Sequence, residues 1–169
     1  MKDIAEIVAT FARIGYLKPA PGTWGSAAAV PVFWAINEAG GFGLVAFATV
    51  VVCIVGLWAT QIMTADAKVG TEEHDPSEIV IDEVAGQWIA LWPVAVGAQM
   101  MGIESARLWP GYLAGFILFR LFDILKPSLI GKADRRGDAV GVMLDDVIAG
   151  IFAAICVVIL AGLAHGFLM

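Results

Sequence analysis

The sequence predicts an all-α membrane protein: a polytopic helix bundle of four to five transmembrane helices plus an N-terminal interfacial helix. Of its 169 residues, 60% are hydrophobic and only 15% are charged, and the mean hydropathy is +0.85. In a typical soluble domain, about a quarter of the residues are charged. Short polar segments separate the apolar runs, without a long linker, a repeat or a low-complexity tract. Residues 1–169 are therefore expected to form a single integral membrane domain.

The first segment has helical periodicity rather than the continuous apolar core of a removed signal peptide. Its apolar residues recur at helical spacing: Ile4, Ile7, Val8, Phe11 and Ile14. This pattern predicts a short helix lying in the membrane interface.

The following apolar runs have the length of membrane spans. A bilayer core of roughly 30 Å needs about 20 apolar helical residues. Four runs fit this length: residues 42–63, 79–101, 109–126 and 146–168. A fifth run, residues 24–37, is shorter and contains Pro31, so we expect it to cross as a kinked or half-length span.

Five crossings sort the charged residues between the two faces of the membrane. Of the ten Lys and Arg residues, only Arg107 falls on the face that holds the C-terminus, and of the sixteen acids only Glu38 and Glu104 do. Cytoplasmic segments carry an excess of Lys and Arg. The opposite face, with residues 1–23, is therefore predicted to be cytoplasmic and to hold the polar chemistry.

Two classes of function are disfavoured by composition. Cys53 and Cys156 lie inside apolar runs and lack the spacing of metal ligands, so we expect neither a disulfide nor a thiol nucleophile. The net charge of −6 argues against nucleic acid as a partner.

The motif HDPSEIVIDEVAGQW places two adjacent carboxylates, Asp82 and Glu83, near the start of a span. The residues from Asp75 to Glu78 form a capping pattern that predicts the helix start. Asp82 and Glu83 would then lie one to two turns inside the helix, where a charge is costly and usually faces a cavity or a partner. Neighbouring side chains point about 100° apart, so we expect one of the two to meet a metal ion directly while the other serves a second ion, a cation or a ligand of the first ion.

The motif FRLFDILKP places Arg120, Asp123 and Lys126 at spacings of three residues near the end of another span. Two interpretations stay open. Arg120 and Asp123 form an intrahelical pair while Lys126 extends to the lipid headgroups, or the two cations receive an anion and Asp123 contributes to a metal site or to positioning.

A second tandem acid pair, Asp145 and Asp146, follows the apolar GVML run at the start of the last span. Acids at a helix N-terminus are favoured by the helix dipole, which is the structural alternative. The occurrence of two such pairs at the same predicted depth favours a functional site.

The motif KPAPGTWGS opens the shorter apolar run. Gly22 and Gly25 permit close backbone approach, and Thr23 and Ser26 add hydroxyl groups at a helix start that attracts anions. With Lys18 at its beginning, this segment is a candidate for binding an anionic substrate.

Together the four motifs form a set of carboxylates and a few cations at one interface. Oxygen ligands without cysteines or a histidine cluster favour Mg²⁺ or Ca²⁺, and cations beside such an ion suit a phosphate ester. His74 is either a proton donor or a solvated loop residue, and His165 lies at the opposite end.

These four motifs, in this order, resemble the phosphatidylglycerophosphatase A family of bacterial inner-membrane enzymes over about residues 15 to 152. The resemblance implies a Mg²⁺-dependent phosphatase in the bacterial inner membrane, with its active site on the cytoplasmic side. Its reaction would be hydrolysis of the terminal phosphomonoester of phosphatidylglycerophosphate to phosphatidylglycerol and inorganic phosphate.

The residues and the resemblance together suggest roles for the charged positions. The catalytic residues would be Asp82, Glu83, Asp123, Asp145 and Asp146. Of these, Asp82, Glu83, Asp145 and Asp146 would hold one or two Mg²⁺ ions that bridge the phosphate and polarise an attacking water. The substrate-binding residues would be Lys18, Thr23, Ser26, Arg120 and Lys126.

Some alternatives remain at this stage. A carboxylate nucleophile is an alternative to water, although the sequence contains no DxDx[TV] or CxxxxxR motif. A membrane cation transporter or a structural subunit with an intramembrane carboxylate site would also explain acids in apolar spans. The sequence leaves open whether the chain forms a homodimer.

Overall fold

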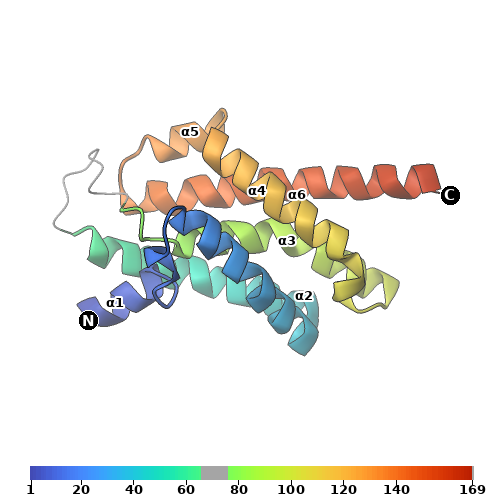
Figure 1. Cartoon of the computed structure of the whole chain (residues 1–169), viewed down its shortest axis with the longest axis horizontal. Coiled ribbons are helices and arrows are strands. Elements are labelled where there is room, and N and C mark those ends of the chain that lie inside the picture. Colours follow the sequence, from blue (N-terminus) through green and yellow to red (C-terminus); the bar gives the residue numbers. More distant parts are fainter. Residues whose placement is uncertain (66–75, 169) are drawn as a thin grey trace.

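The computed structural model describes residues 1–65 and 76–168, and within them every regular element is a helix (Figure 1). This confirms the prediction of an all-α fold. The elements in chain order are α1 (Lys2–Ala9), η1 (Ile14–Tyr16), α2 (Pro21–Met63), α3 (Ile81–Met101), η3 (Ser105–Leu108), α4 (Trp109–Leu125), α5 (Leu129–Asp134) and α6 (Ala139–Leu168).

Helix α2 consists of two arms that run in opposite directions (Figure 1). Gly41, with φ 65° and ψ −165°, breaks the helix between them, and this backbone conformation is accessible to glycine and costly for other residues. Pro31 lies inside the first arm, which continues through it. The first arm spans residues 21–40, so it is longer than the apolar run from which the sequence predicts a half-length span.

Helix α3 is the central element and packs against α2, α4 and α6. Most of its residues are buried. Three helical segments are long and apolar enough to span a membrane, namely Pro21–Met63, Ser105–Leu125 and Ala139–Gly166. α3 is not among them, although the sequence predicts a span over residues 79–101. An interior helix contacts other helices rather than lipid, so it tolerates polar residues that a lipid-facing helix does not. The number of crossings stays a prediction.

Close contacts fix the position of α3 between its neighbours. The Trp88 indole N–H donates to the carbonyl of Ala29, at 2.9 Å, and so ties α3 to the first arm of α2. On the other side, a Cβ added at Gly150 of α6 would lie 2.3 Å from the Gly86 carbonyl oxygen. Small residues allow such backbone approach between helices, which brings the starts of α3 and α6 together.

The N-terminal segment does not form the single helix that its periodicity predicts. α1 ends at Ala9, and Phe11, Ala12 and Arg13 all have positive φ. Phe11 and Ile14 therefore do not continue the helical face that the sequence predicts. Ile4 and Ile7 are exposed on α1, and its placement in a membrane interface stays a prediction.

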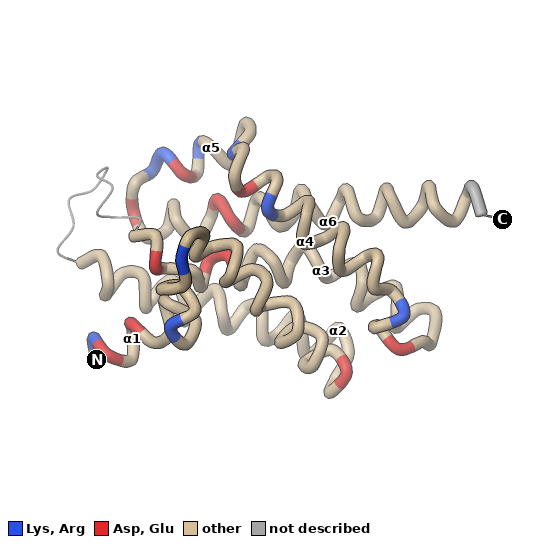
Figure 2. Tube along the Cα trace, in the orientation of Figure 1, with Lys and Arg blue, Asp and Glu red and all other residues tan. Residues whose placement is uncertain are grey.

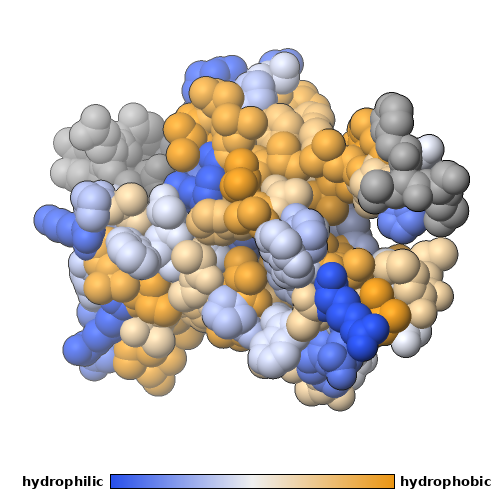
Figure 3. Space-filling view, turned by 45° about the vertical axis from the view of Figure 1, so that its right-hand side comes forward, coloured by the Kyte–Doolittle hydropathy of each residue, from blue (hydrophilic) through white to orange (hydrophobic). Residues whose placement is uncertain are grey.

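Apolar side chains cover the outside of the bundle. On α4, Leu113, Ile117, Leu121 and Ile124 recur at helical spacing and are each about half exposed or more. Apolar side chains are likewise spread over the face seen in Figure 3 rather than gathered in one patch. Such a surface is typical of helices that face lipid.

The charged residues gather at one end of the bundle (Figure 2). This end holds α1 and α5 and the starts of α3 and α6, while a few charges lie at the opposite end, near the turn of α2 and near η3 (Figures 1 and 2). The sorting of charges predicted from the sequence is therefore present in the fold.

Candidate active site

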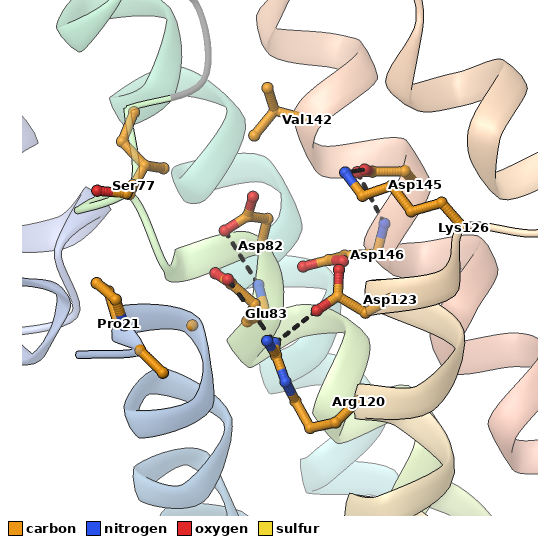
Figure 4. A pocket seen from close by; sticks show the side chains of 13 residues that line it. Pro21, Ser77, Asp82, Glu83, Arg120, Asp123, Lys126, Val142, Asp145 and Asp146 are labelled. Carbon is orange, nitrogen blue, oxygen red and sulfur yellow. Dashed lines mark hydrogen bonds and ion pairs between the residues drawn. The ribbon is translucent and has the colours of Figure 1, made fainter. Parts of the chain in front are cut away.

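A cavity of about 300 Å³ opens at the charged end, between the beginning of α2, the beginnings of α3 and α6 and the end of α4 (Figure 4). Seven of the charged residues predicted from the sequence line it: Asp82, Glu83, Arg120, Asp123, Lys126, Asp145 and Asp146. Acids that are far apart in the chain thus share one space, which the functional interpretation required.

Three carboxylates converge in this cavity. One oxygen each from Asp82, Glu83 and Asp146 lie within 4.8 Å of one another. We call these three residues the acid cluster. Asp82 and Asp146 are buried, with 6% and 3% of their surface exposed. Both neighbours on α3 offer an oxygen to the cluster, and which of them would meet a metal ion directly stays a prediction.

The acids of α3 lie closer to its start than the capping pattern predicts. The helix begins at Ile81 rather than near Asp75, so Asp82 and Glu83 are in its first turn. Asp75 and His74 lie outside the described residues. The helix dipole favours acids in a first turn, but it does not require them to be buried and to converge.

The acids of α6 show the opposite difference. α6 begins at Ala139, and no acid lies in its first turn. Asp145 and Asp146 are therefore more than one turn inside the helix, where the dipole effect has fallen off. The structural alternative considered for this pair does not account for it.

Gly22 lets the beginning of α2 approach the acid cluster. A Cβ added there would lie 2.0 Å from Oε1 of Glu83 and 3.2 Å from Nη1 of Arg120. Any larger residue would push the two helices apart or displace Glu83.

Arg120 connects three parts of the site. Its Nη1 lies 2.6 Å from Oδ2 of Asp123 and 3.9 Å from Oε1 of Glu83, and it donates to the Ser26 hydroxyl at 3.4 Å. The intrahelical pair predicted from the sequence is present. Arg120 also faces the acid cluster, so the functional interpretation is compatible with the structural one.

Lys126 is held by two carboxylates. Its Nζ donates to Asp134 of α5 and, at 2.9 Å, to Oδ2 of Asp145. Partial burial lowers the pKa of Lys126, but the hydrogen bonds to Asp134 and Asp145 outweigh it and raise the pKa above its ordinary value. Lys126 therefore remains a cation, and it pairs with Asp145, which is not part of the acid cluster.

The substrate-binding residues predicted in the KPAPGTWGS motif differ in their positions relative to the cavity. Ser26 is buried and contacts the site through Arg120. Lys18 is exposed, and neither Lys18 nor Thr23 lines the cavity. Instead the wall on this side includes Pro21, together with Gly22.

Sequence reasoning assigned Ser77 to a helix start, and the structure places it in the cavity wall (Figure 4). A serine in a turn gives no local sign of such a role. Its position depends on the loop that precedes α3.

The acid cluster fits a hard divalent cation. Its donors are carboxylate oxygens, which Mg²⁺ prefers, and Oε2 of Glu83 is buried without a hydrogen-bond partner. A buried unpartnered carboxylate oxygen is costly unless a cation or a donor meets it.

Comparison with known proteins identifies the family of this chain. The family model of phosphatidylglycerophosphatase A matches residues 7–161. The chain belongs to the phosphatidylglycerophosphatase A family. The match covers all four motifs that carry the resemblance.

Curated relatives cover most of the chain. The phosphatidylglycerophosphatase A of Haemophilus influenzae is 36% identical over 144 residues, which are 85% of this chain and 80% of that protein. That of Escherichia coli is 32% identical over 135 residues, 79% of this chain and 70% of that protein. A putative phosphatidylinositol-3-phosphatase of Bacteroides thetaiotaomicron is 31% identical over 150 residues, 86% of each protein. No solved structure matches the chain.

Proposed function

We propose that this member of the phosphatidylglycerophosphatase A family hydrolyses the terminal phosphomonoester of phosphatidylglycerophosphate, with Mg²⁺ held by the acid cluster. The products are phosphatidylglycerol and inorganic phosphate. The observation that carries the proposal is the convergence of Asp82, Glu83 and Asp146 from two helices beside Arg120, in a cavity at the end of a lipid-facing bundle.

The acid cluster and Arg120 would have different roles in the reaction of the phosphate. Asp82, Glu83 and Asp146 would hold the ion, which supplies charge for the phosphoryl oxygens and a lowered pKa for water. Arg120 places a permanent positive charge at the same cavity, suited to charge that develops on the equatorial oxygens. Asp123, at 2.6 Å from Arg120, orients that guanidinium.

The beginning of α2 supports the phosphate from another side. Pro21 and Gly22 line the cavity, and the N-cap residue Ala20 has no side chain to bond the first N–H groups of the helix. N–H groups of a first turn have no partner within the helix and attract anions.

Water is the nucleophile in this proposal. Its oxygen attacks phosphorus, the bond from phosphorus to the glycerol oxygen breaks, and the glycerol oxygen leaves as an alcohol after it takes up a proton. Attack by a carboxylate of the acid cluster is the alternative, and it would leave a phosphorylated aspartate or glutamate that can be trapped.

The arrangement suits a substrate that stays in the membrane. The apolar faces of the bundle keep the acyl chains in lipid while the headgroup enters the cavity at the charged end. The excess of Lys and Arg at that end supports a cytoplasmic placement in a bacterial inner membrane.

Magnesium dependence tests the proposal directly. We expect purified protein in mixed micelles to release phosphate from phosphatidylglycerophosphate with Mg²⁺, to stop with EDTA and to recover when Mg²⁺ is restored. Phosphatidylinositol 3-phosphate is the comparison substrate, because one relative carries that name.

Two results would contradict the proposal. Undiminished phosphate release after removal of divalent cations would exclude the ion. Absence of release, together with cation flux into liposomes that contain the protein, would favour the transporter instead.

A further inference from the structure

Gln87 of α3 is an unusual side chain for the interior of a membrane protein. It is fully buried, and neither its Oε1 nor its Nε2 has a hydrogen-bond partner in the structure. A buried polar group without a partner costs about 1–3 kcal/mol. A leucine would fill this position without that cost, so packing alone does not account for the amide.

Two other buried polar atoms without partners belong to the active site. They are Oε2 of Glu83, which accepts hydrogen bonds, and Nε of Arg120, which donates one. The two side chains adjoin, because Nη1 of Arg120 lies 3.9 Å from Oε1 of Glu83.

Gln87 lies one helical turn beyond Glu83. Residues four apart on a helix occupy the same face and contact each other. A glutamine amide has an NH₂ donor and a carbonyl acceptor. These two functions match the unpartnered acceptor of Glu83 and the unpartnered donor of Arg120.

We propose that Gln87 is a positioning residue of the active site, whose NH₂ group donates towards Oε2 of Glu83 and whose carbonyl accepts from the side of Nε of Arg120, each through one bridging water. This inference rests on the proposed function, because Glu83 holds the ion and Arg120 meets the phosphate there. With Oε2 held by the amide, Oε1 is oriented towards the acid cluster. Partners that orient metal ligands in this way change metal affinity or activity about 10- to 100-fold when they are removed.

The chain offers a matched control at the opposite end of the bundle. Asn37 of α2 is also a buried amide, 8% exposed, and its Oδ1 has no hydrogen-bond partner. Neither amide lines the cavity, but Gln87 lies one helical turn from Glu83, whereas Asn37 lies four residues before the break in α2 at Gly41. Replacing each amide by an apolar residue separates a role in the site from the general effect of removing a buried polar group.

The experiment compares Gln87→Met, Gln87→Leu and Asn37→Leu with the unchanged protein. Four quantities are measured on purified protein: Mn²⁺ affinity by electron paramagnetic resonance without substrate, thermal unfolding temperature, and kcat and KM with phosphatidylglycerophosphate. We expect the Mn²⁺ affinity and the kcat of both Gln87 variants to be about 10- to 100-fold lower than those of the unchanged protein. Their unfolding temperature should not fall below that of Asn37→Leu, because each variant replaces one buried amide by an apolar residue. Asn37→Leu should leave Mn²⁺ affinity and kcat within about twofold of the unchanged protein, a difference of under 0.5 kcal/mol.

The proposal is overturned if both Gln87 variants keep Mn²⁺ affinity and kcat within twofold. It is also overturned if their losses accompany a lowered unfolding temperature to the same degree as in Asn37→Leu, since that pattern is structural. The metal measurement needs no turnover. An unchanged protein that binds Mn²⁺ but releases no phosphate would therefore reject the proposed function and still test Gln87.

Discussion

Asp145 and Asp146 are neighbours in the sequence but have different partners in the site. Asp146 joins the acid cluster, whereas Asp145 accepts a hydrogen bond from Lys126 at 2.9 Å. The sequence treats the pair as equivalent metal ligands. The difference depends on where Lys126 lies, and no local pattern contains that information.

The two acids should therefore respond differently to the same substitution. We expect Asp146→Asn to lower Mn²⁺ affinity and kcat by about 100-fold or more, because it removes a charged ligand from a buried site. Asp145→Asn should keep Mn²⁺ affinity within about tenfold and act mainly on KM, because Lys126 loses one of its two carboxylates. Titration with Mn²⁺ and steady-state kinetics measure both, and equal losses of Mn²⁺ affinity would contradict the assignment.

Among the helices, the approach of α2 to α3 depends on Gly22. A methyl group at this position would meet Oε1 of Glu83 at 2.0 Å, which is shorter than any real contact of a Cβ atom. We expect Gly22→Ala to lower kcat by at least about tenfold while the protein still folds, because the displacement falls on Glu83, a proposed metal ligand. Phosphate release and thermal unfolding measure the two effects.

Gly43 provides the control for this substitution. It lies in the second arm of α2, and a Cβ added there meets nothing within 4 Å. Gly43→Ala should leave kcat unchanged, and the helical position favours alanine over glycine. Equal activity of the Gly22 and Gly43 variants would show that the close approach at Gly22 has no part in the reaction.

The start of α3 shows where prediction from the sequence fails. The capping pattern at Asp75 to Glu78 predicts a helix there, yet the helix begins at Ile81. The N–H of Val80 donates to the carbonyl of Ala9 at 2.9 Å, and a Cβ on Gly15 would lie 1.9 Å from the Glu78 carbonyl oxygen. These contacts come from a distant part of the chain, and they outweigh the local preference.

The two arms of α2 show where prediction succeeds. The apolar runs 24–37 and 42–63 fall one in each arm, on either side of Gly41. The lengths of apolar runs are local properties, so they can be recognised directly from the sequence. The meeting of Asp82, Glu83 and Asp146 also agrees with the prediction from the sequence, because α3 and α6 begin at the same end of the bundle (Figure 1).

For the whole molecule, the two termini lie at opposite ends of the bundle (Figure 1). If the bundle crosses the membrane as the sequence predicts, the termini lie on opposite faces. We expect green fluorescent protein to fluoresce when fused at the N-terminus, and alkaline phosphatase to be active when fused at the C-terminus. Fluorescence from both ends would require an even number of crossings and would contradict the five-crossing arrangement.

The connections at the end opposite the cavity are short. Among the described residues, the chain there consists of the turn at Gly41, the segment of residues 102–108 and the last residues of α6 (Figure 1). A protease or an antibody confined to that compartment would find little polypeptide to recognise. If the bundle crosses the membrane as the sequence predicts, the described residues leave few positions on that side for a water-soluble protein to contact.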